Sequence, residues 1–311
     1  MKDVLVLGTA VIDITAAPIG NTSSWEEKQR IETIVAFPGG DAANQSIRLA
    51  DLGCSVDICC KFGDDAIADM LSSSLEKRGV GISLVARSHS TPTTAALVLV
   101  DNYGERHTFS VKGAHRALDK DDLCKVNPSE YRAISLASLF SMPELEKDGL
   151  QDFLKMVHSL PSSNRPLVFA DLGSDKKKQG IEGIRRFLPY IDYFLPSIYD
   201  AQSMAGQNDI ESIARFYLEK GVSTVVIKCG ADGCFCMTGE NFYTVPAAAV
   251  TPVDTTGAGD TFVAYFISRI LKQISLKESA SFACKGASLS TLYMGASAHK
   301  ITEKDILNAE I

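Results

Sequence analysis

The chain has 311 residues, of which 45% are hydrophobic and 22% are charged, and its formal net charge is −7. This composition is typical of a globular protein and leaves enough chain for one large α/β domain with a small appendage. The negative net charge and the lack of a long basic tract argue against nucleic-acid binding. The sequence contains no run of 18 apolar residues, so no membrane-spanning helix is predicted. Eight scattered cysteines without a Cys-x-x-Cys pair indicate reduced thiols in a cytoplasmic protein.

The first predicted elements are two strands, at residues 3–8 and 31–37. Asp13 lies between them, in the sequence VIDIT. A carboxylate within an apolar run needs a partner or a function. Asp13 is therefore either a turn or capping residue or a group at a strand end that binds substrate hydroxyls.

The sequence FPGGDAANQSIRLADLG, at 37–53, predicts a tight turn followed by a helix. Gly39 and Gly40 form the turn, and small residues at the start of the helix let another molecule approach the backbone. Asp41 and Asn44 flank this start. They either belong to a well-capped helix or form hydrogen bonds to a polyol that the glycines admit.

A predicted strand at 56–63 and a helix through Leu75 to Gly79 come next. Two further strands are expected at 93–100 and 105–111, and the glycine turn between them predicts a hairpin.

From about residue 131 the pattern alternates strands with helices, which predicts a parallel, doubly wound sheet with right-handed crossovers. Asp171 ends an apolar strand, where ligand sites form in such sheets. A turn follows Lys228, and Cys234–Met237 is the expected return strand, with Cys234 and Cys236 on one face. The predicted strands are 133–139, 166–171, 193–195 and 224–228, and the predicted helices are 146–158, 180–188 and 210–220.

The sequence TPVDTTGAGDTFVAYFISRIL, at 251–271, predicts a glycine turn that leads into a buried helix. The N-terminus of such a helix has unpaired backbone N–H groups and a positive dipole, and binds anions such as phosphate. Asp260, at this end, either caps the helix or accepts a proton from a hydroxyl that attacks phosphorus. Asp254, six positions earlier, either binds a cation or stabilises the loop. No G-x-x-x-x-G-K-[ST] string is present, which excludes a P-loop.

The string DTTGAGDTF resembles the C-terminal signature of the PfkB carbohydrate kinase family, the ribokinase-like sugar and nucleoside kinases. The string GG-x-x-x-N at 39–44, followed by a helix that ends in Leu-Gly, resembles the N-terminal signature of the same family. The resemblance covers essentially the whole chain. It implies a single kinase domain, 1–311, with the ribokinase-like three-layer α/β/α sandwich, a mostly parallel doubly wound sheet, and a small β-sheet lid from parts of about 14–36 and 93–112.

The resemblance also implies an ATP-dependent carbohydrate kinase, which transfers phosphate to an alcohol group of a sugar or sugar acid. Asp260 would be the general base, next to an anion hole formed at Gly257, Ala258 and Gly259. The acceptor would be bound by Asp13, Gly39, Gly40, Asp41 and Asn44. ATP would be bound by Lys228, Gly230, Gly233, Ser197 and Cys284, Mg²⁺ by Asp200 through water, and a monovalent cation such as K⁺ beside Asp254.

Four positions depart from the family pattern. Asp41 stands where ribokinase-type members often have Lys, so the acceptor can differ from ribose. Ser197 and Asp200 replace the usual N-x-x-E, and Cys284 replaces an Asn that contacts the purine.

Few aromatic residues lie around 13–44 to stack on a base, which favours a sugar or sugar acid as the acceptor. A nucleoside kinase of this family, or a non-catalytic sugar or nucleotide sensor on the same fold, is the alternative. By analogy with the family, a homodimer through the lid is expected.

Overall fold

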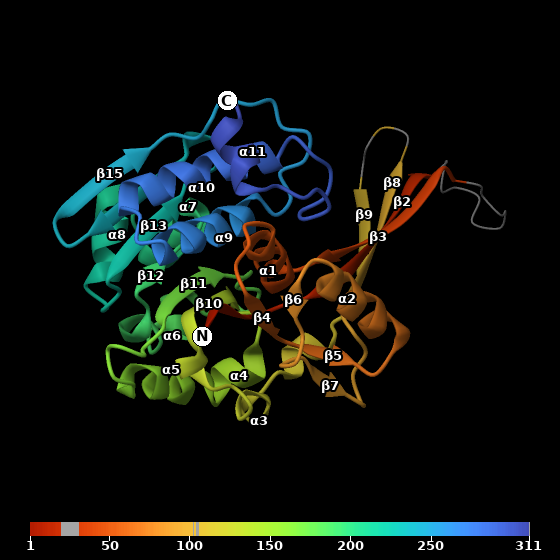
Figure 1. The fold of residues 1–311 in the computed structure, drawn as a ribbon, viewed down its shortest axis with the longest axis horizontal. Coiled ribbons are helices and arrows are strands. Elements are labelled where there is room, and N and C mark those ends of the chain that lie inside the picture. The colour runs from red at the N-terminus through yellow and green to blue at the C-terminus, as the bar shows by residue number, and fades with distance from the viewer. Residues whose placement is uncertain (20–30, 102, 104–105, 311) are drawn as a thin grey trace.

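The structure, a computed structural model, describes residues 1–19, 31–101, 103 and 106–310 (Figure 1). Its largest element is a nine-stranded sheet in the order β15-β14-β13-β12-β11-β10-β1-β4-β6. Neighbouring strands are parallel from β6 to β13, and β14 and β15 are added antiparallel at one edge. The strands are β1 (Lys2–Leu7), β4 (Val56–Cys59), β6 (Val80–Gly81), β10 (Tyr131–Leu139), β11 (Leu167–Leu172), β12 (Tyr193–Phe194), β13 (Thr224–Lys228), β14 (Cys234–Thr238) and β15 (Asn241–Val245).

Helices cover both faces of this sheet, so the protein is a three-layer α/β/α sandwich (Figure 1). One face carries α1 (Asp41–Asp51), α2 (Ala66–Lys77), α9 (Ala258–Leu271), α10 (Leu276–Ser290) and α11 (Glu303–Asn308). The other face carries α3 (Lys120–Leu123), α4 (Pro143–Lys147), α5 (Leu150–Ser159), α6 (Gly180–Ile184), α7 (Ile198–Ala205) and α8 (Ile210–Leu218).

Strand β1 shows how the sequence produces two hydrophobic cores. Its side chains alternate between the two faces of the sheet, so Val4 and Val6 pack in one core while Leu5 and Leu7 pack in the other. A strand that is buried on both faces reads as a continuous apolar run, as VLVL does here.

A second, four-stranded sheet in the order β3-β2-β8-β9 projects from the sandwich (Figure 1). Its strands are β2 (Val11–Ile19), β3 (Thr33–Gly39), β8 (Ala95–Asp101) and β9 (Arg106–Ser110). β8 and β9 pair antiparallel, as the predicted hairpin requires, and β2 joins them to β3. The part of the predicted lid at 20–30 lies outside the described residues. Among the described residues, no helix is long and apolar enough to cross a membrane.

Three predicted elements are divided in the structure. The predicted strand 56–63 ends at Cys59, and β5 (Lys61–Gly63) pairs instead with β7 (Ala86–Ser88). The predicted helix 146–158 is two helices, α4 and α5, because Gly149 has a φ of 125° and breaks the run. The predicted helix 180–188 ends at Ile184, and a 3₁₀ turn that contains Pro189 follows it, because proline has no N–H to donate to the carbonyl of Arg185 and its ring would clash with that carbonyl in an α-helix.

The prediction for the strand after Lys228 is confirmed. β14 returns antiparallel to β13, and the thiols of Cys234 and Cys236 lie on one face with their sulfurs 3.9 Å apart.

Candidate active site

Helix α9 begins at a turn that requires glycine at position 257. Gly257 has a φ of 72°, a left-handed conformation that favours glycine. A Cβ atom on this residue would also lie 2.5 Å from the Cβ of Ala296 and 2.9 Å from its Cα. The first-turn amides of Gly259 and Asp260 have no acceptor inside the helix, whereas the amide of Ala258 donates to the carbonyl of Thr255 (3.2 Å).

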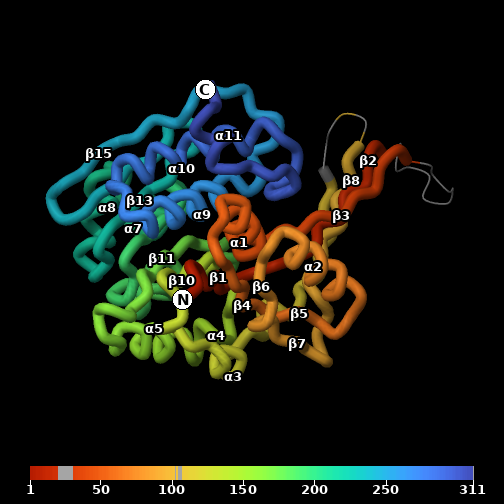
Figure 2. The backbone as a smooth tube through the Cα atoms, in the orientation of Figure 1, coloured from red at the N-terminus to blue at the C-terminus, as the bar shows by residue number. Residues whose placement is uncertain are grey.

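Asp260 lies in this first turn, and its carboxylate is held by a neighbouring helix. Asn44 Nδ2 donates to Oδ2 of Asp260 (2.9 Å), and Gln45 Nε2 donates to Oδ1 (3.4 Å). Ser135 Oγ, on β10, donates to Gln45 Oε1 (2.7 Å) and so orients that amide. The side chain of Asp260 is buried, with an exposed fraction of 9%. Helices α1 and α9 are neighbours, and α1 lies between α9 and the small sheet (Figure 2).

Gln45 was not among the residues that the sequence singled out. It is fully buried although it is polar, and its neighbours Asn44 and Ser46 are buried as well. A run of polar residues between the apolar residues of this helix is the signal that could have identified it, because buried polar groups are normally hydrogen-bonded.

Burial gives the carboxylates at this place unusual acidities. It raises the pKa of Asp260 well above its usual range, and the charges of Asp41 and Asp171 raise this pKa further. The hydrogen bond from Asn44 and the charge of Lys228 act in the opposite direction and lower it. Burial, and then the charge of Asp171, raise the pKa of Asp41 to about 6. Burial also raises the pKa of Asp171, although Lys228 forms an ion pair with it and lowers it. A negative group that enters here therefore depends on Lys228 and the α9 amides for compensation.

The residues expected to bind the acceptor do come together. Asp13, on β2, lies directly against Gly39, since a Cβ on Gly39 would be 2.2 Å from Oδ2 of Asp13. Gly40 has a φ of 86° and lies against the backbone of Thr9, where an added Cβ would be 2.8 Å from the carbonyl oxygen. Burial raises the pKa of Asp13. These residues lie at the junction of the small sheet with the N-terminus of α1, which carries Asp41 and Asn44.

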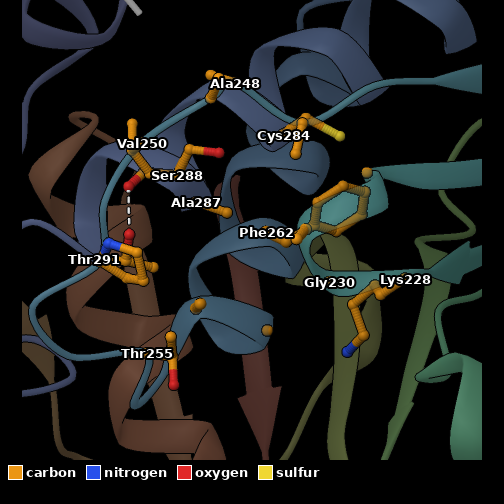
Figure 3. Close-up of a pocket in the computed structure, with 17 residues that line it drawn as sticks. Lys228, Gly230, Ala248, Val250, Thr255, Phe262, Cys284, Ala287, Ser288 and Thr291 are labelled. Atoms are coloured by element: carbon orange, nitrogen blue, oxygen red, sulfur yellow. Dashed lines mark hydrogen bonds between the residues drawn. The ribbon is translucent and has the colours of Figure 1, made fainter.

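A cavity of about 400 Å³ lies at the start of α9 (Figure 3). Ala258 and Gly259 form part of its wall. Its size is that of a site for a small organic ligand. In Figure 3, Lys228 and Thr255 lie toward one end of the cavity, and Cys284 and Ala248 toward the other. The other lining residues are Gly230, Ala231, Gly233, Ala247, Ala249, Val250, Pro252, Phe262, Ala287, Ser288 and Thr291.

Lys228, Gly230, Gly233 and Cys284, which the sequence predicted at the nucleotide, all line this cavity, and Ser197 does not. The wall formed by 247–250 was not predicted, because a run of small apolar residues after a strand carries no specific signal.

Ser197 and Asp200 interact with one another. Ser197 caps α7, where its hydroxyl donates to Oδ2 of Asp200 (2.5 Å) and accepts from the amide of the same residue (3.2 Å). Ser197 forms a β-bridge with Lys228, and the charge of Asp200 raises the pKa of Asp171. Asp200 therefore lies close to the site but outside the wall of the cavity.

Asp254 ties the glycine turn to a distant loop. Its Oδ1 accepts from the amide (3.0 Å) and the hydroxyl (2.6 Å) of Thr256, and its Oδ2 accepts from the amide of Gly295 (2.9 Å). The sequence left two roles open for Asp254, to bind a cation or to stabilise the loop. These three contacts are those of a residue that stabilises the loop.

A doubly wound sheet with a helix N-terminus that opens into a ligand-sized cavity is typical of α/β proteins that bind phosphate-bearing ligands. Residues 1–303 match the model of the pfkB family carbohydrate kinase, and the chain belongs to this family. The ribokinase of Staphylococcus aureus (strain COL) is 25% identical over 306 residues, which cover 95% of each chain.

Solved structures share the fold of this chain. A putative ribokinase II from E. coli, in complex with ATP and Mg²⁺, has a TM-score of 0.83 at 21% identity, and the match covers 99% of this chain and 98% of that one. The ribokinase of Arabidopsis thaliana, complexed with ribose and ATP, has a TM-score of 0.79 at 24% identity, with 98% and 97% covered. The fold of this chain is therefore the ribokinase fold.

Proposed function

We propose that the protein transfers the γ-phosphoryl group of ATP to a hydroxyl of a sugar or sugar acid. One observation carries this proposal: the Asp260 carboxylate accepts from Asn44 on the acceptor side, and Ala258 and Gly259, the two residues before Asp260 on α9, line the cavity. Membership in a family of carbohydrate kinases, and relatives solved with ATP and with ribose, support it.

In the proposed reaction the acceptor hydroxyl lies at Asp260, oriented by Asp13, Asp41 and Asn44. Asp260 accepts the hydroxyl proton as the oxygen forms a bond to the γ-phosphorus, and the bond to the bridging oxygen of ADP breaks. The amides at the start of α9 donate to the charge that develops on the transferring group, as a preorganised anion hole. Among these, Gly259 and Asp260 carry the larger share, since Ala258 already donates within the turn.

The oxygen donors near the cavity fit a hydrated magnesium ion. The carboxylate of Asp200, close to Asp171, would hold Mg²⁺ through water, as this ion keeps most of its hydration shell. When bound, Mg²⁺ neutralises charge on the phosphates.

A monovalent cation such as K⁺ beside Asp254 is also part of the proposal. The hydroxyl of Ser297 is buried without a hydrogen-bond partner among the described residues, and it follows Gly295, which contacts Asp254. A buried oxygen without a protein partner, two residues along the chain from the contact with Asp254, suits an oxygen-coordinated cation.

ADP release from Mg-ATP, measured across a panel of sugars, sugar acids and nucleosides, tests the proposed function. A strong response to one sugar or sugar acid supports it and identifies the acceptor. A response to nucleosides alone would establish a nucleoside kinase instead. Binding of ATP without turnover on any acceptor would favour the sensor.

The pH dependence of turnover should respond to Asp41. Because the charge of Asp41 raises the pKa of Asp260, Asp41→Asn is expected to lower the pKa of Asp260 and to move the acidic limb of kcat to lower pH. The measurement is kcat against pH at saturating acceptor. Asp13→Asn is the matched control, which should weaken acceptor binding without moving the limb. A limb that stays in place in Asp41→Asn would contradict the coupling.

We also propose that the small sheet acts as a lid and that two copies pair through it. Its outer face exposes Ile34 (68%), Leu97 (40%) and Phe109 (58%), and Val111, directly after β9, is also exposed (51%). Leu97 and Phe109 are cross-strand partners, next to Ile14 and therefore on the face opposite Asp13. An exposed apolar patch of this kind marks an interaction surface.

ATP use and eight free cysteines favour the cytoplasm as the compartment.

Phe109→Asp is expected to convert a dimer into a monomer in light scattering, because a buried unpaired carboxylate opposes the contact. Leu307→Asp, on α11, is the control, since Leu307 is equally exposed (59%) but lies outside the small sheet. A parent protein that is already monomeric, or a Phe109→Asp variant that stays dimeric, would exclude this interface.

A further inference from the structure

Arg48 is a fully buried cation that the proposed reaction does not use. It lies on α1 one turn after Asn44, and its side chain has no exposed area. Arginine is almost never fully buried without partners. Its guanidinium donates to two backbone carbonyls far along the chain, from Nη1 to His299 (2.7 Å) and from Nη2 to Ala296 (2.8 Å).

A second arginine completes this arrangement. Arg78, after the end of α2, donates from Nη1 to the carbonyl of Ser297 (2.7 Å) and from Nη2 to both carboxylate oxygens of Asp51 (2.9 and 2.7 Å). Asp51, at the end of α1, lies 3.7 Å from Nη1 of Arg48. The two guanidinium groups and this carboxylate, here called the arginine clamp, hold three carbonyls of the segment 295–299.

The clamped segment forms the support of the glycine turn at the start of α9. The amide of Gly295 donates to Asp254, which also binds Thr256 in the turn. Ala296 lies so close to Gly257 that an added Cβ would clash with its Cα at 2.9 Å. Displacement of the segment would therefore displace the turn that carries the proposed anion hole.

The position of Arg48 on α1 makes this support part of the acceptor site. Asn44 and Arg48 are four residues apart, so they lie on the same face of the helix. The first contacts Asp260, and the second holds the segment behind Gly257. One rigid helix thus contacts both the carboxylate and the support of the turn.

We propose that Arg48 is a positioning residue that aligns the turn at Gly257 with the acceptor-binding residues of α1. The proposal rests on the kinase function proposed above. The planar fork of arginine donates to two carbonyls in a defined geometry, which a lysine ammonium cannot reproduce. Among the described residues, Arg48 is not part of the cavity wall and forms no hydrogen bond with Asp260, so its effect is on alignment and not on ligand binding.

The test compares Arg48→Met and Arg48→Lys with the parent protein. A misplacement of about 1 Å at a reacting centre lowers the rate about 100-fold, so kcat is expected to fall about 100-fold in Arg48→Met and about 10-fold in Arg48→Lys. KM for ATP and for the acceptor should change less than about 3-fold, since the binding groups remain. Guanidinium ion should restore part of kcat in an Arg48→Ala variant, whose short side chain leaves the position of the guanidinium group empty.

Arg165→Met is the control for loss of a partly buried arginine that donates two hydrogen bonds from its guanidinium. Arg165 forms a two-bond ion pair with Asp192 (3.0 and 2.9 Å), away from the turn. This variant should lose thermal stability while keeping kcat. If Arg48→Met also keeps kcat, or loses only substrate affinity, Arg48 is a purely structural residue and the proposal is wrong.

Hydrogen exchange gives a readout that does not depend on turnover. In Arg48→Met, but not in Arg165→Met, amides in the segments 291–300 and 254–259 are expected to exchange faster together. Faster exchange confined to 291–300 would overturn the coupling to the turn. If the parent phosphorylates no acceptor, the kinase function fails, while joint exchange of the two segments still decides whether Arg48 positions the turn.

Discussion

Replacement of Asp260 by asparagine is expected to lower kcat about 1,000-fold and to leave ATP binding close to that of the parent protein. The amide keeps the size of the side chain but cannot accept the hydroxyl proton. Asp260 is buried in the first turn of α9 and its two oxygens accept from Asn44 and Gln45, so asparagine removes one of the two acceptors together with the charge. Turnover on the acceptor identified in the panel, and calorimetric titration with an ATP analogue, measure the two quantities. Activity that survived nearly whole would show that Asp260 is not the base.

The same variant is expected to be more stable than the parent at pH 8. Burial raises the pKa of Asp260 in the folded protein above the value of an unfolded aspartate, about 4. The folded state therefore binds this proton more tightly, and stability is lost as the pH rises toward and through the folded pKa. Asparagine removes the buried charge, so the difference in melting temperature should be largest at pH 8 and should shrink as the pH falls toward 4.

Asp152→Asn, the same exchange at a side chain with 78% exposure on α5, serves as the control and should change neither kcat nor stability. Catalytic groups often lower the stability of the folded protein, because activity requires them in an environment that does not suit their charge. Equal melting temperatures of parent and Asp260→Asn at pH 8 would contradict the raised pKa.

Gly257→Ala is expected to lower kcat about 100-fold, because the new Cβ would press on Ala296 and displace the turn. Two effects act at this position. The left-handed φ of 72° disfavours alanine by about 1 kcal/mol, and the contact with backbone and side chain of Ala296 adds a clash that cannot be relieved by rotating a flexible group.

Gly206→Ala separates these effects. Gly206 ends α7 with a φ of 66°, and an added Cβ there would meet no atom within 4 Å. It therefore introduces the same backbone strain without the clash, and should lower the melting temperature with kcat preserved. Comparison of kcat and melting temperature in the two variants measures how much the turn depends on close contact with 295–299. If kcat fell by the same small amount in Gly257→Ala and Gly206→Ala, the turn would tolerate displacement and the prediction would be wrong.

Local patterns in the sequence predicted the two helices that meet at the site, α9 and α1. The glycine turn and the apolar run at 251–271 predicted α9, and GG-x-x-x-N with its helix predicted α1. The alternation of strands and helices after residue 131 predicted the doubly wound sheet, which is confirmed. Each of these signals lies within a short window, where periodicity, glycine conformation and helix ends depend mainly on neighbouring residues.

Element ends and interruptions were less predictable. Gly149 could have formed a helix interior at modest cost, and its actual φ of 125° depends on how α4 and α5 pack on the sheet. The break between β4 and β5 likewise depends on a pairing partner, β7, more than twenty residues later. Such outcomes are decided by which packing buries the apolar faces.

The sequence by itself determined the fold class, the family, the position of Asp260 at a helix N-terminus and the glycines around it. Only the tertiary structure placed Gln45 on Asp260, 215 residues away, and Ser135 on Gln45, 90 residues away. It also decided the partners of Arg48, which lie 248 and 251 residues along the chain. The physical reason is that a buried polar side chain must satisfy its hydrogen bonds with whatever group the packed layers bring to it, and no local pattern specifies that group.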